Sequence, residues 1–188
     1  MKTYTVNIKG ITPYMQHRMD DIKLAQWEKN RGLIIERDSL DDEPTKLAGY
    51  HSYIDQEGNY FIPSEHFKQS FVKGGGMVKG KVGSATKSMK NVVAAMWFIN
   101  PEKIKFRKFD EVDTRSAVNR NVKARVIVHR PKWIDWTCSF NLMVDNDSLT
   151  IETIKSIIEY SGKYIGVGSY RPEHTGEYGR FEAEIIKV

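Results

Sequence analysis

The chain has 188 residues, the size of one ordinary domain, and its 40% hydrophobic and 28% charged residues are typical of a folded protein rather than a disordered one. No apolar run approaches the roughly 18 residues of a membrane-spanning helix, and the single Cys138 excludes an intramolecular disulfide or a cysteine-built zinc site. The first residues lack the apolar block of a secretory signal. We therefore expect a cytoplasmic protein that forms a single domain over residues 1–188.

The net charge of +5 is distributed unevenly along the chain. No acidic residue occurs between Glu65 and Glu102 or between Asp113 and Asp135, although each stretch carries six cations. Concentrated cations are typical of a protein that binds a polyanion, because each neutralised phosphate releases counterions. Two solvated basic faces are the alternative. The cations are Lys68, Lys73, Lys79, Lys81, Lys87 and Lys90 in the first stretch, and Arg115, Arg120, Lys123, Arg125, Arg130 and Lys132 in the second.

The N-terminal third of the chain predicts a strand, a helix and a hairpin. Alternation over residues 2–9 predicts a strand, and apolar spacing over 20–30 predicts a helix. The acidic, polar residues 36–46 are typical of a loop. Residues 50–62 predict a hairpin, because turn-forming residues separate two short apolar runs.

A basic loop is expected in the middle of the chain. A short helix should begin at about Ser64, with Pro63 setting its entry and Phe67 and Phe71 buried. The three glycines at 74–76 are expected to end it. Residues 73–90 are rich in glycine and lysine, which predicts a mobile basic loop.

The following stretch predicts three strands and a loop. The apolar run 92–99 favours a buried strand, although its alanines leave a helix open, and a further strand is expected near 104–109. Residues 111–122 are typical of a polar loop. Residues 124–129 predict a strand that ends at Arg130 and Pro131, and alternation over 136–144 gives the strongest strand signal in the chain.

The C-terminal part predicts a helix followed by a strand. Ser148 or Thr150 should cap a helix that ends near Gly162, and residues 181–185 alternate as a final strand. The order of elements favours an α+β, ferredoxin-like fold: a mainly antiparallel sheet with helices on one face and an inserted basic, glycine-rich loop. The expected inward residues of the helix are Ile151, Ile154, Ile157 and Ile158.

Residues 162–181, between this helix and strand, interleave glycines, tyrosines and cations. Glycine lets a backbone approach a ligand closely, while aromatic rings stack on bases and cations pair with phosphates. The helix-then-strand order is opposite to that of Rossmann and P-loop phosphate sites, which excludes those classes. A tight helix-to-strand crossover, with its tyrosines packed on the sheet, is a compatible structural explanation.

Three short motifs resemble the CRISPR-associated RAMP superfamily, whose members are ferredoxin-like RNA binders. They are the glycine-rich run before the last strand, residues 10–13 (GITP) after the first strand, and residues 61–67 (FIPSEHF), where a strand passes into a helix through Pro-Ser. The glycine-rich run also resembles that of small uncharacterised phage and prophage proteins. The resemblance implies a RAMP-like domain that holds RNA or single-stranded DNA, with residues 73–90 in the place of a thumb.

An enzyme of RAMP type would be a metal-independent endoribonuclease, which needs a general acid or base such as histidine. His17, just beyond the first strand, is the candidate catalytic residue. No pattern of carboxylates and histidines predicts a metal site, and no cofactor is expected. A third hypothesis is a phage-type inhibitor or assembly protein that binds an acidic protein surface.

The first hypothesis is non-catalytic binding of single-stranded nucleic acid, RNA rather than DNA. A homo-oligomer or filament along the strand, and a protein partner, stay open. Trp133 is included because it neighbours cations, whereas Trp136 is expected in the core. Gly166, Gly168, Gly176 and Gly179 are expected to shape the loop. The predicted nucleic-acid-binding residues are Lys73, Lys79, Lys81, Lys87, Arg115, Arg120, Arg125, Trp133, Tyr170, Arg171, His174 and Arg180.

Overall fold

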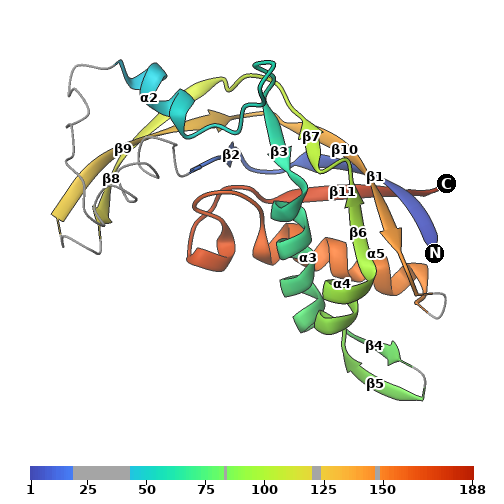
Figure 1. The fold of residues 1–188 in the computed structure, drawn as a ribbon. Helices are drawn as coiled ribbons and strands as arrows, with labels where there is room; N and C mark the ends of the chain where they lie inside the picture. The colour runs from blue at the N-terminus through green and yellow to red at the C-terminus, as the bar shows by residue number, and fades with distance from the viewer. Residues whose placement is uncertain (19–42, 83, 120–123, 147–148) are drawn as a thin grey trace, which may run out of the picture.

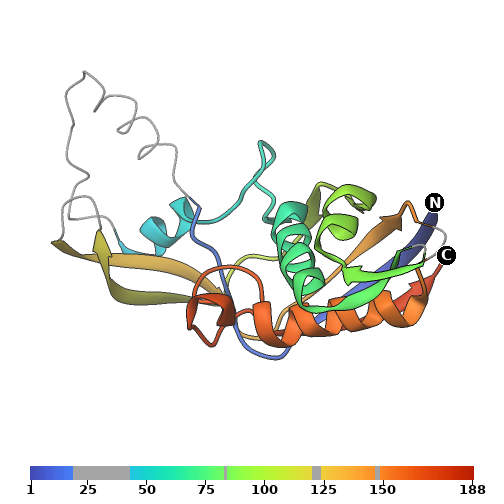
Figure 2. The same cartoon turned by 90° about the horizontal axis from the view of Figure 1, so that it is seen from below.

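The structure is a computed structural model that describes residues 1–18, 43–82, 84–119, 124–146 and 149–188. Its centre is a four-stranded antiparallel sheet with the strand order β11-β1-β10-β6 (Figure 1). Helices α3 and α5 cover one face of this sheet (Figure 2). The elements are β1 (Lys2–Gly10), α3 (Ser64–Met77), β6 (Trp97–Asn100), β10 (Thr137–Val144), α5 (Ile151–Tyr160) and β11 (Phe181–Lys187).

The connectivity of these six elements is βαββαβ, with the fourth, first, third and second strands side by side. This arrangement is the ferredoxin-like fold, and it confirms the fold class predicted from the sequence. The two helices lie on the same face, as expected.

The alternating side chains of β1 and β10 explain why these strands pair in this register. Val6 lies opposite Phe140 and Tyr4 opposite Leu142, so the apolar residues of both strands point to one face of the sheet. All four are buried. Phe67 and Phe71 of α3 pack on this face, and the Thr150 hydroxyl caps α5 by accepting from the Thr153 N–H. The predicted inward residues of α5 are confirmed for Ile154, Ile157 and Ile158, while Ile151 is partly buried.

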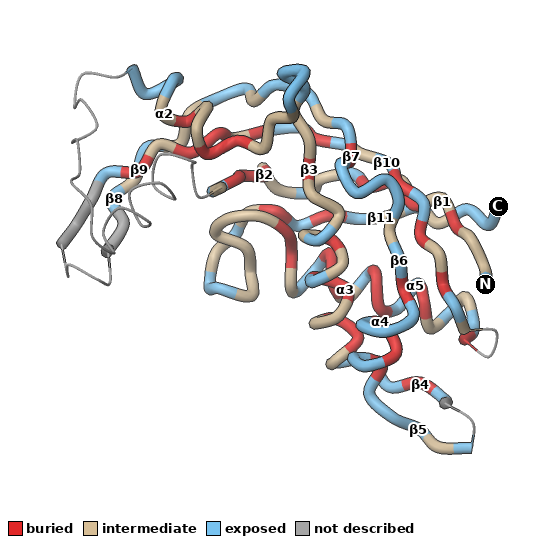
Figure 3. Tube along the Cα trace, viewed as in Figure 1, coloured by how far each residue is buried: buried red, intermediate tan, exposed pale blue. Residues whose placement is uncertain are grey.

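Several shorter elements are inserted between the ferredoxin-like elements. The longest is the β8–β9 hairpin, which pairs with β2 in a three-stranded sheet and extends to the left in Figure 1. Figure 3 shows buried positions that run from the helices into the base of this hairpin. The inserted elements are β2 (Tyr14–Met15), α2 (Pro44–Tyr50), β3 (Phe61–Pro63), β4 (Lys79–Val82), β5 (Ala85–Ser88), α4 (Lys90–Met96), β7 (Lys103–Lys105), β8 (Glu111–Asn119) and β9 (Ala124–Trp133).

Helix α3 continues through the three glycines that were expected to end it. A β-carbon on Gly74 would lie 2.1 Å from the Ser161 hydroxyl oxygen, and one on Gly75 would lie 2.9 Å from a Val93 methyl. These glycines therefore let α3 approach α4 and the end of α5 closely, rather than breaking the helix. The predicted basic loop is in fact the end of α3 followed by the β4–β5 hairpin.

Two further expectations for the middle of the chain are wrong. The strand favoured over 92–99 begins only at Trp97, and residues 90–96 form helix α4, the alternative that the alanines left open. Residues 111–119 form strand β8 instead of a loop, because β9 supplies backbone partners along its whole length. Strand β9 also continues past Pro131 to Trp133.

In the N-terminal third, an isolated bridge between Ile54 and Tyr60 confirms the predicted turn. The predicted helix at 20–30 lies outside the described residues, as does most of the predicted loop at 36–46. Helix α2 begins within the end of that loop. No helix in the described ranges combines the length and apolar character needed to cross a bilayer.

Candidate nucleic-acid interface

The glycine-rich loop, residues 166–180, is held against the chain that follows β1. The Ser169 N–H donates to the Met15 carbonyl at 2.8 Å, and the Gly179 N–H donates to the Pro13 carbonyl at 2.8 Å. Within the loop, the Val167 N–H donates to the Gly179 carbonyl at 2.9 Å. The loop is therefore held by backbone hydrogen bonds near both of its ends.

The loop glycines are required by this close packing. Gly179 has a φ of +71°, and a β-carbon there would lie 1.8 Å from the Val167 carbonyl oxygen. A β-carbon on Gly176 would lie 1.7 Å from the Tyr170 carbonyl oxygen. The predicted tight crossover is thus present, and it determines where the tyrosines and arginines of the loop lie.

Two arginines of the β8–β9 hairpin meet two tyrosines of the loop in what we call the Arg–Tyr cluster: Arg115, Arg130, Tyr170 and Tyr178. The guanidinium carbon of Arg115 lies 5.3 Å from the ring centre of Tyr170 and 5.0 Å from that of Tyr178. The guanidinium carbon of Arg130 lies 4.8 Å from the Tyr170 ring centre. The Tyr170 ring therefore interacts with two guanidinium groups.

Arg115 is the accessible arginine of the cluster, with 39% of its side chain exposed. Its Nε donates to the Asp113 carboxylate at 2.9 Å, and its Nη2 donates to the Tyr178 hydroxyl. Its side chain is therefore oriented by fixed contacts while part of its surface stays open to solvent.

Arg130, in contrast, is only 5% exposed. Its Nε donates to Nδ1 of His17 at 2.9 Å. Its Nη1 is buried and has no hydrogen-bond acceptor among the described residues. A buried guanidinium nitrogen without an acceptor is rare in proteins, so this atom marks Arg130 as an unusual position.

A pocket of about 430 Å³ lies beside the cluster, between α3 and the glycine-rich loop. Arg130, Lys73 and Arg171 contribute cations to its lining, and Glu65 and Glu173 contribute carboxylates. It therefore contains three fixed positive charges against two negative ones.

Glu173 organises the loop side of this pocket. Lys73 forms an ion pair with its carboxylate, and the Arg171 Nε donates to it at 2.9 Å. Burial alone would raise the pKa of Glu173, but the hydrogen bonds from Lys73 and Arg171 hold that pKa below its usual value. Glu173 is therefore ionised at neutral pH and ties α3 to the loop.

His66 lies in the same pocket, and it is neutral. Burial, assisted by the nearby Arg171 charge, lowers the pKa of His66 to about 4. The Tyr14 hydroxyl lies 3.3 Å from its Nδ1. Burial also raises the pKa of Tyr14 above its usual value, so this tyrosine stays protonated.

His17, the candidate catalytic residue, also lines the pocket. Its ring stacks on His51 with a centroid distance of 4.6 Å and an interplanar angle of 16°. Because Arg130 donates to Nδ1, the lone pair of that nitrogen is occupied and cannot accept a substrate proton. Endoribonuclease activity stays a prediction.

The predicted lysines Lys79, Lys81 and Lys87 do not join this site. They lie on the β4–β5 hairpin, which we call the lysine hairpin, residues 79–88. Figures 1 and 2 both place this hairpin far from the β8–β9 hairpin. Its register puts Lys79 and Lys81 on one face, while Lys87 lies opposite Gly80 on the other.

Of the remaining predicted residues, the structure brings Arg115 together with Tyr170, and Lys73 together with Arg171 through Glu173. His174 and Arg180 are exposed positions of the loop. Arg120 lies outside the described residues. The backbone of Arg125 pairs with Val118, and its side chain is outside the described part of the structure.

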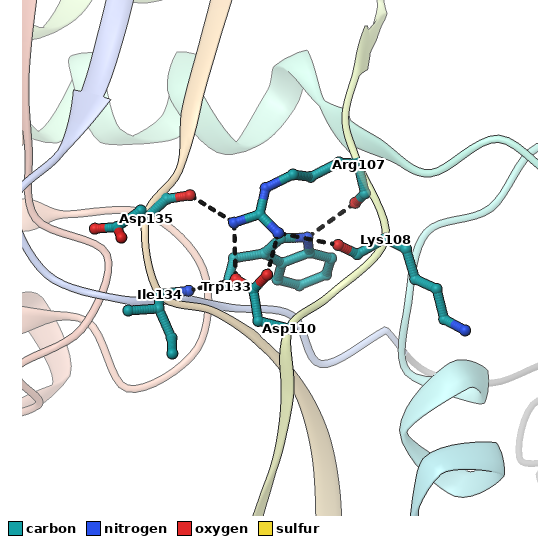
Figure 4. Close-up of polar contacts among 6 residues, drawn as sticks. All are labelled: Arg107, Lys108, Asp110, Trp133, Ile134 and Asp135. Carbon is teal, nitrogen blue, oxygen red and sulfur yellow. Dashed lines mark hydrogen bonds and ion pairs between the residues drawn. The ribbon is translucent and has the colours of Figure 1, made fainter.

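The expectation that the Trp133 ring lies at the surface is wrong. Trp133 is fully buried, and its indole N–H donates to the Arg107 carbonyl at 2.9 Å (Figure 4). Arg107 and Asp110 form an ion pair at the same place, and the Asp110 carboxylate accepts from the Ile134 N–H at 2.9 Å. This network anchors the base of the β8–β9 hairpin to the core, and Trp136 is buried as expected.

Arg130, Tyr178 and Glu173 were not among the predicted site residues. Arg130 belongs to the second basic stretch and was predicted to lie at the end of a strand. In the structure, Val128 and Arg130 are both buried on one face of β9. An arginine on the inward face of an alternating strand is a signal that the sequence contained.

No family model matches the chain, and no curated protein matches it. Among solved structures, one chain of the Type III-B Cmr-beta complex bound to cognate target RNA, determined by cryo-EM, is similar to 99% of this chain. The TM-score is 0.51 and the sequence identity 12%, and the match covers 61% of that chain. This protein therefore spans less than two thirds of the length of its structural neighbour. The likeness shows a shared fold.

Proposed function

We propose that this protein binds single-stranded nucleic acid, RNA in preference to DNA, at the Arg–Tyr cluster. The observation that carries this proposal is the meeting of two arginines from one hairpin with two tyrosines from the glycine-rich loop. Tyrosine rings and guanidinium planes stack on unpaired bases, and guanidinium groups also pair with phosphates. The part of Arg115 that is exposed is available for such contacts.

The open face of the central sheet offers a weaker alternative surface. Its side chains are polar and bond one another: Ser139 donates to Asn7 at 2.8 Å, and Asn7 donates to Glu184 at 3.1 Å. Glu182 and Glu184 add negative charge on β11, which repels phosphates. The cluster is therefore the better candidate than the sheet surface on which other ferredoxin-like proteins stack bases.

RNA is the first nucleic acid to test. The similar Cmr-beta chain belongs to a complex bound to cognate target RNA. Likeness of fold does not transfer a ligand, so RNA is the first probe to use rather than a conclusion.

Fluorescence anisotropy tests the proposal with labelled single-stranded RNA, single-stranded DNA and duplex DNA over a salt series. We expect the tightest binding for a single strand, weakening as salt rises. Arg115→Gln should weaken single-strand binding by about tenfold, the size of one charge-assisted contact. Lys155→Gln, which removes an exposed cation from α5, is the matched control and should change little.

Two results would contradict the proposal. Equal affinity of the Arg115→Gln and Lys155→Gln variants would remove the cluster from the binding site. Failure to bind any probe near physiological salt would favour a protein partner with an acidic surface.

A denaturing gel of the same samples in EDTA should show intact RNA, and product that disappears in His17→Ala would favour the endoribonuclease instead. Cooperative binding curves would indicate a filament along the strand.

A further inference from the structure

We infer that the pocket beside the Arg–Tyr cluster holds the terminal phosphate of the bound strand, with Arg130 as its buried ligand. This inference rests on the proposed function and specifies which part of the nucleic acid enters the pocket. It follows from the burial of Arg130, from the charges of the pocket and from its position next to the cluster.

Arg130 is the first reason. It lines the pocket, it is 5% exposed, and its Nη1 has no acceptor among the described residues. Asp113, its cross-strand neighbour on β8, pairs with Arg115 through Oδ1, and its buried Oδ2 has no hydrogen-bond partner among the described residues. An unpaired buried donor is costly, and the cost is greater for a charged group. A phosphate in the pocket would supply the missing acceptor.

The charge of the pocket is the second reason. Lys73, Arg130 and Arg171 exceed the two carboxylates, Glu65 and Glu173, by one positive charge. Lys73 and Arg171 both pair with Glu173, whereas Arg130 forms no ion pair among the described residues. One phosphate group therefore matches the pocket better than several.

The position of the pocket favours a strand end over an internal phosphate. Buried Arg130 lines the pocket and lies 4.8 Å from the Tyr170 ring centre, and partly exposed Arg115 lies 5.3 Å from the same ring centre, so the cluster connects the surface with the pocket. An internal phosphodiester would need to enter and leave with chain on both sides. A terminal phosphate has one substituent and carries between one and two negative charges near neutral pH, which strengthens its pairing with guanidinium.

The test compares three RNA oligonucleotides of one sequence with an internal fluorophore: one with a 5′-phosphate, one with a 3′-phosphate and one with hydroxyl groups at both ends. We expect one phosphorylated form to bind the unmodified protein at least about tenfold more tightly than the hydroxyl form. The identity of that form assigns the end of the strand that enters.

Variants locate the effect. Arg130→Gln should remove the preference for the phosphorylated end, so that the phosphorylated and hydroxyl forms bind with equal affinity. Because Arg130 is buried and that variant risks misfolding, Lys73→Gln provides a second test at a half-exposed position and should reduce the preference severalfold. Lys155→Gln should keep the preference unchanged.

The outcomes separate the two proposals. Equal binding of all three oligonucleotides by the unmodified protein overturns this inference alone. Absence of binding by all three overturns the proposed function and the inference together. A preference that survives in both Arg130→Gln and Lys73→Gln would show that the terminal phosphate binds elsewhere and also overturns the inference.

Discussion

The lysines of the lysine hairpin and the arginines of the Arg–Tyr cluster come from two stretches of sequence with six cations each, yet they differ in exposure and in their contacts. Lys79, Lys81 and Lys87 are exposed, and their side chains have no ion-pair partner within the described part of the chain. Arg115 and Arg130 are instead held by hydrogen bonds and by the rings of Tyr170 and Tyr178. Equal charge in the sequence thus becomes a solvated surface in one region and an ordered site in the other.

The difference has consequences for binding. Flexible, hydrated lysines attract any polyanion and are strongly screened by salt, whereas oriented arginines bind phosphates and bases in fixed geometry. We therefore assign long-range attraction to the lysine hairpin and the positioning of the strand to the cluster. The following changes separate these two contributions.

The largest effect is expected from Gly179→Ala. Its positive φ and the 1.8 Å approach to the Val167 carbonyl oxygen leave no room for a methyl group. The free energy of unfolding should fall by about 2–4 kcal/mol. RNA affinity should fall until only the salt-sensitive attraction by the lysine hairpin is left. Thermal unfolding and anisotropy measure both. Gly49→Ala, where a β-carbon meets nothing within 4 Å, is the control and should change stability by less than about 1 kcal/mol.

Tyr170→Leu should have the next largest effect. Leucine keeps an apolar side chain but removes the aromatic ring on which both arginines stack. Affinity for single-stranded RNA should fall about tenfold, because both guanidinium groups lose the ring that positions them. Duplex binding should change much less, and an equal loss for single strand and duplex would contradict a role of the cluster in single-strand binding.

The double variant Lys79→Glu and Lys81→Glu should have a smaller and more uniform effect. These residues share one face of the hairpin, so their reversal changes one electrostatic surface. Affinity should fall severalfold for every sequence tested, and the slope of affinity against salt should decrease by about 1.4, the value for two single-strand phosphate contacts. An unchanged slope would remove the hairpin from the binding surface.

The smallest effect is a dependence of stability on pH through His66. Its pKa is lowered from 6.5 in the unfolded chain to about 4 in the folded protein. The folded state therefore binds a proton at His66 less readily than the unfolded state does. The stability contributed by neutral His66 is fully present above pH 6.5 and is lost as the pH falls toward 4. Between pH 7.5 and 6 the loss from His66 should stay below about 1 kcal/mol. Thermal unfolding of His66→Gln, which cannot titrate, should lack this component of the pH dependence.

The ferredoxin-like core was predictable from local patterns. Alternation in β1 and β10, the capped helix α5 and the last strand each carry their own signal, and together they determine the order of elements. The loop residues Tyr170 and Arg171 were also predictable, because glycines, rings and cations occur together there.

The partnerships in the site were not predictable in the same way. The glycines at 74–76 allow helices to approach, and this function depends on Ser161 and Val93, which are distant in sequence. The sequence of β8 lacks an apolar pattern, and these residues form a strand because β9 pairs with them. The separation of the lysine hairpin from the cluster depends on the same long-range packing.

Photo-cross-linking of single-stranded RNA that contains 4-thiouridine, followed by mass spectrometry of the peptides, tests the central claim most directly. We predict cross-links in the glycine-rich loop, at Tyr170 or Tyr178, that are lost with Arg115→Gln and kept with Lys155→Gln. Cross-links confined to the lysine hairpin or to the open face of the central sheet would contradict the account.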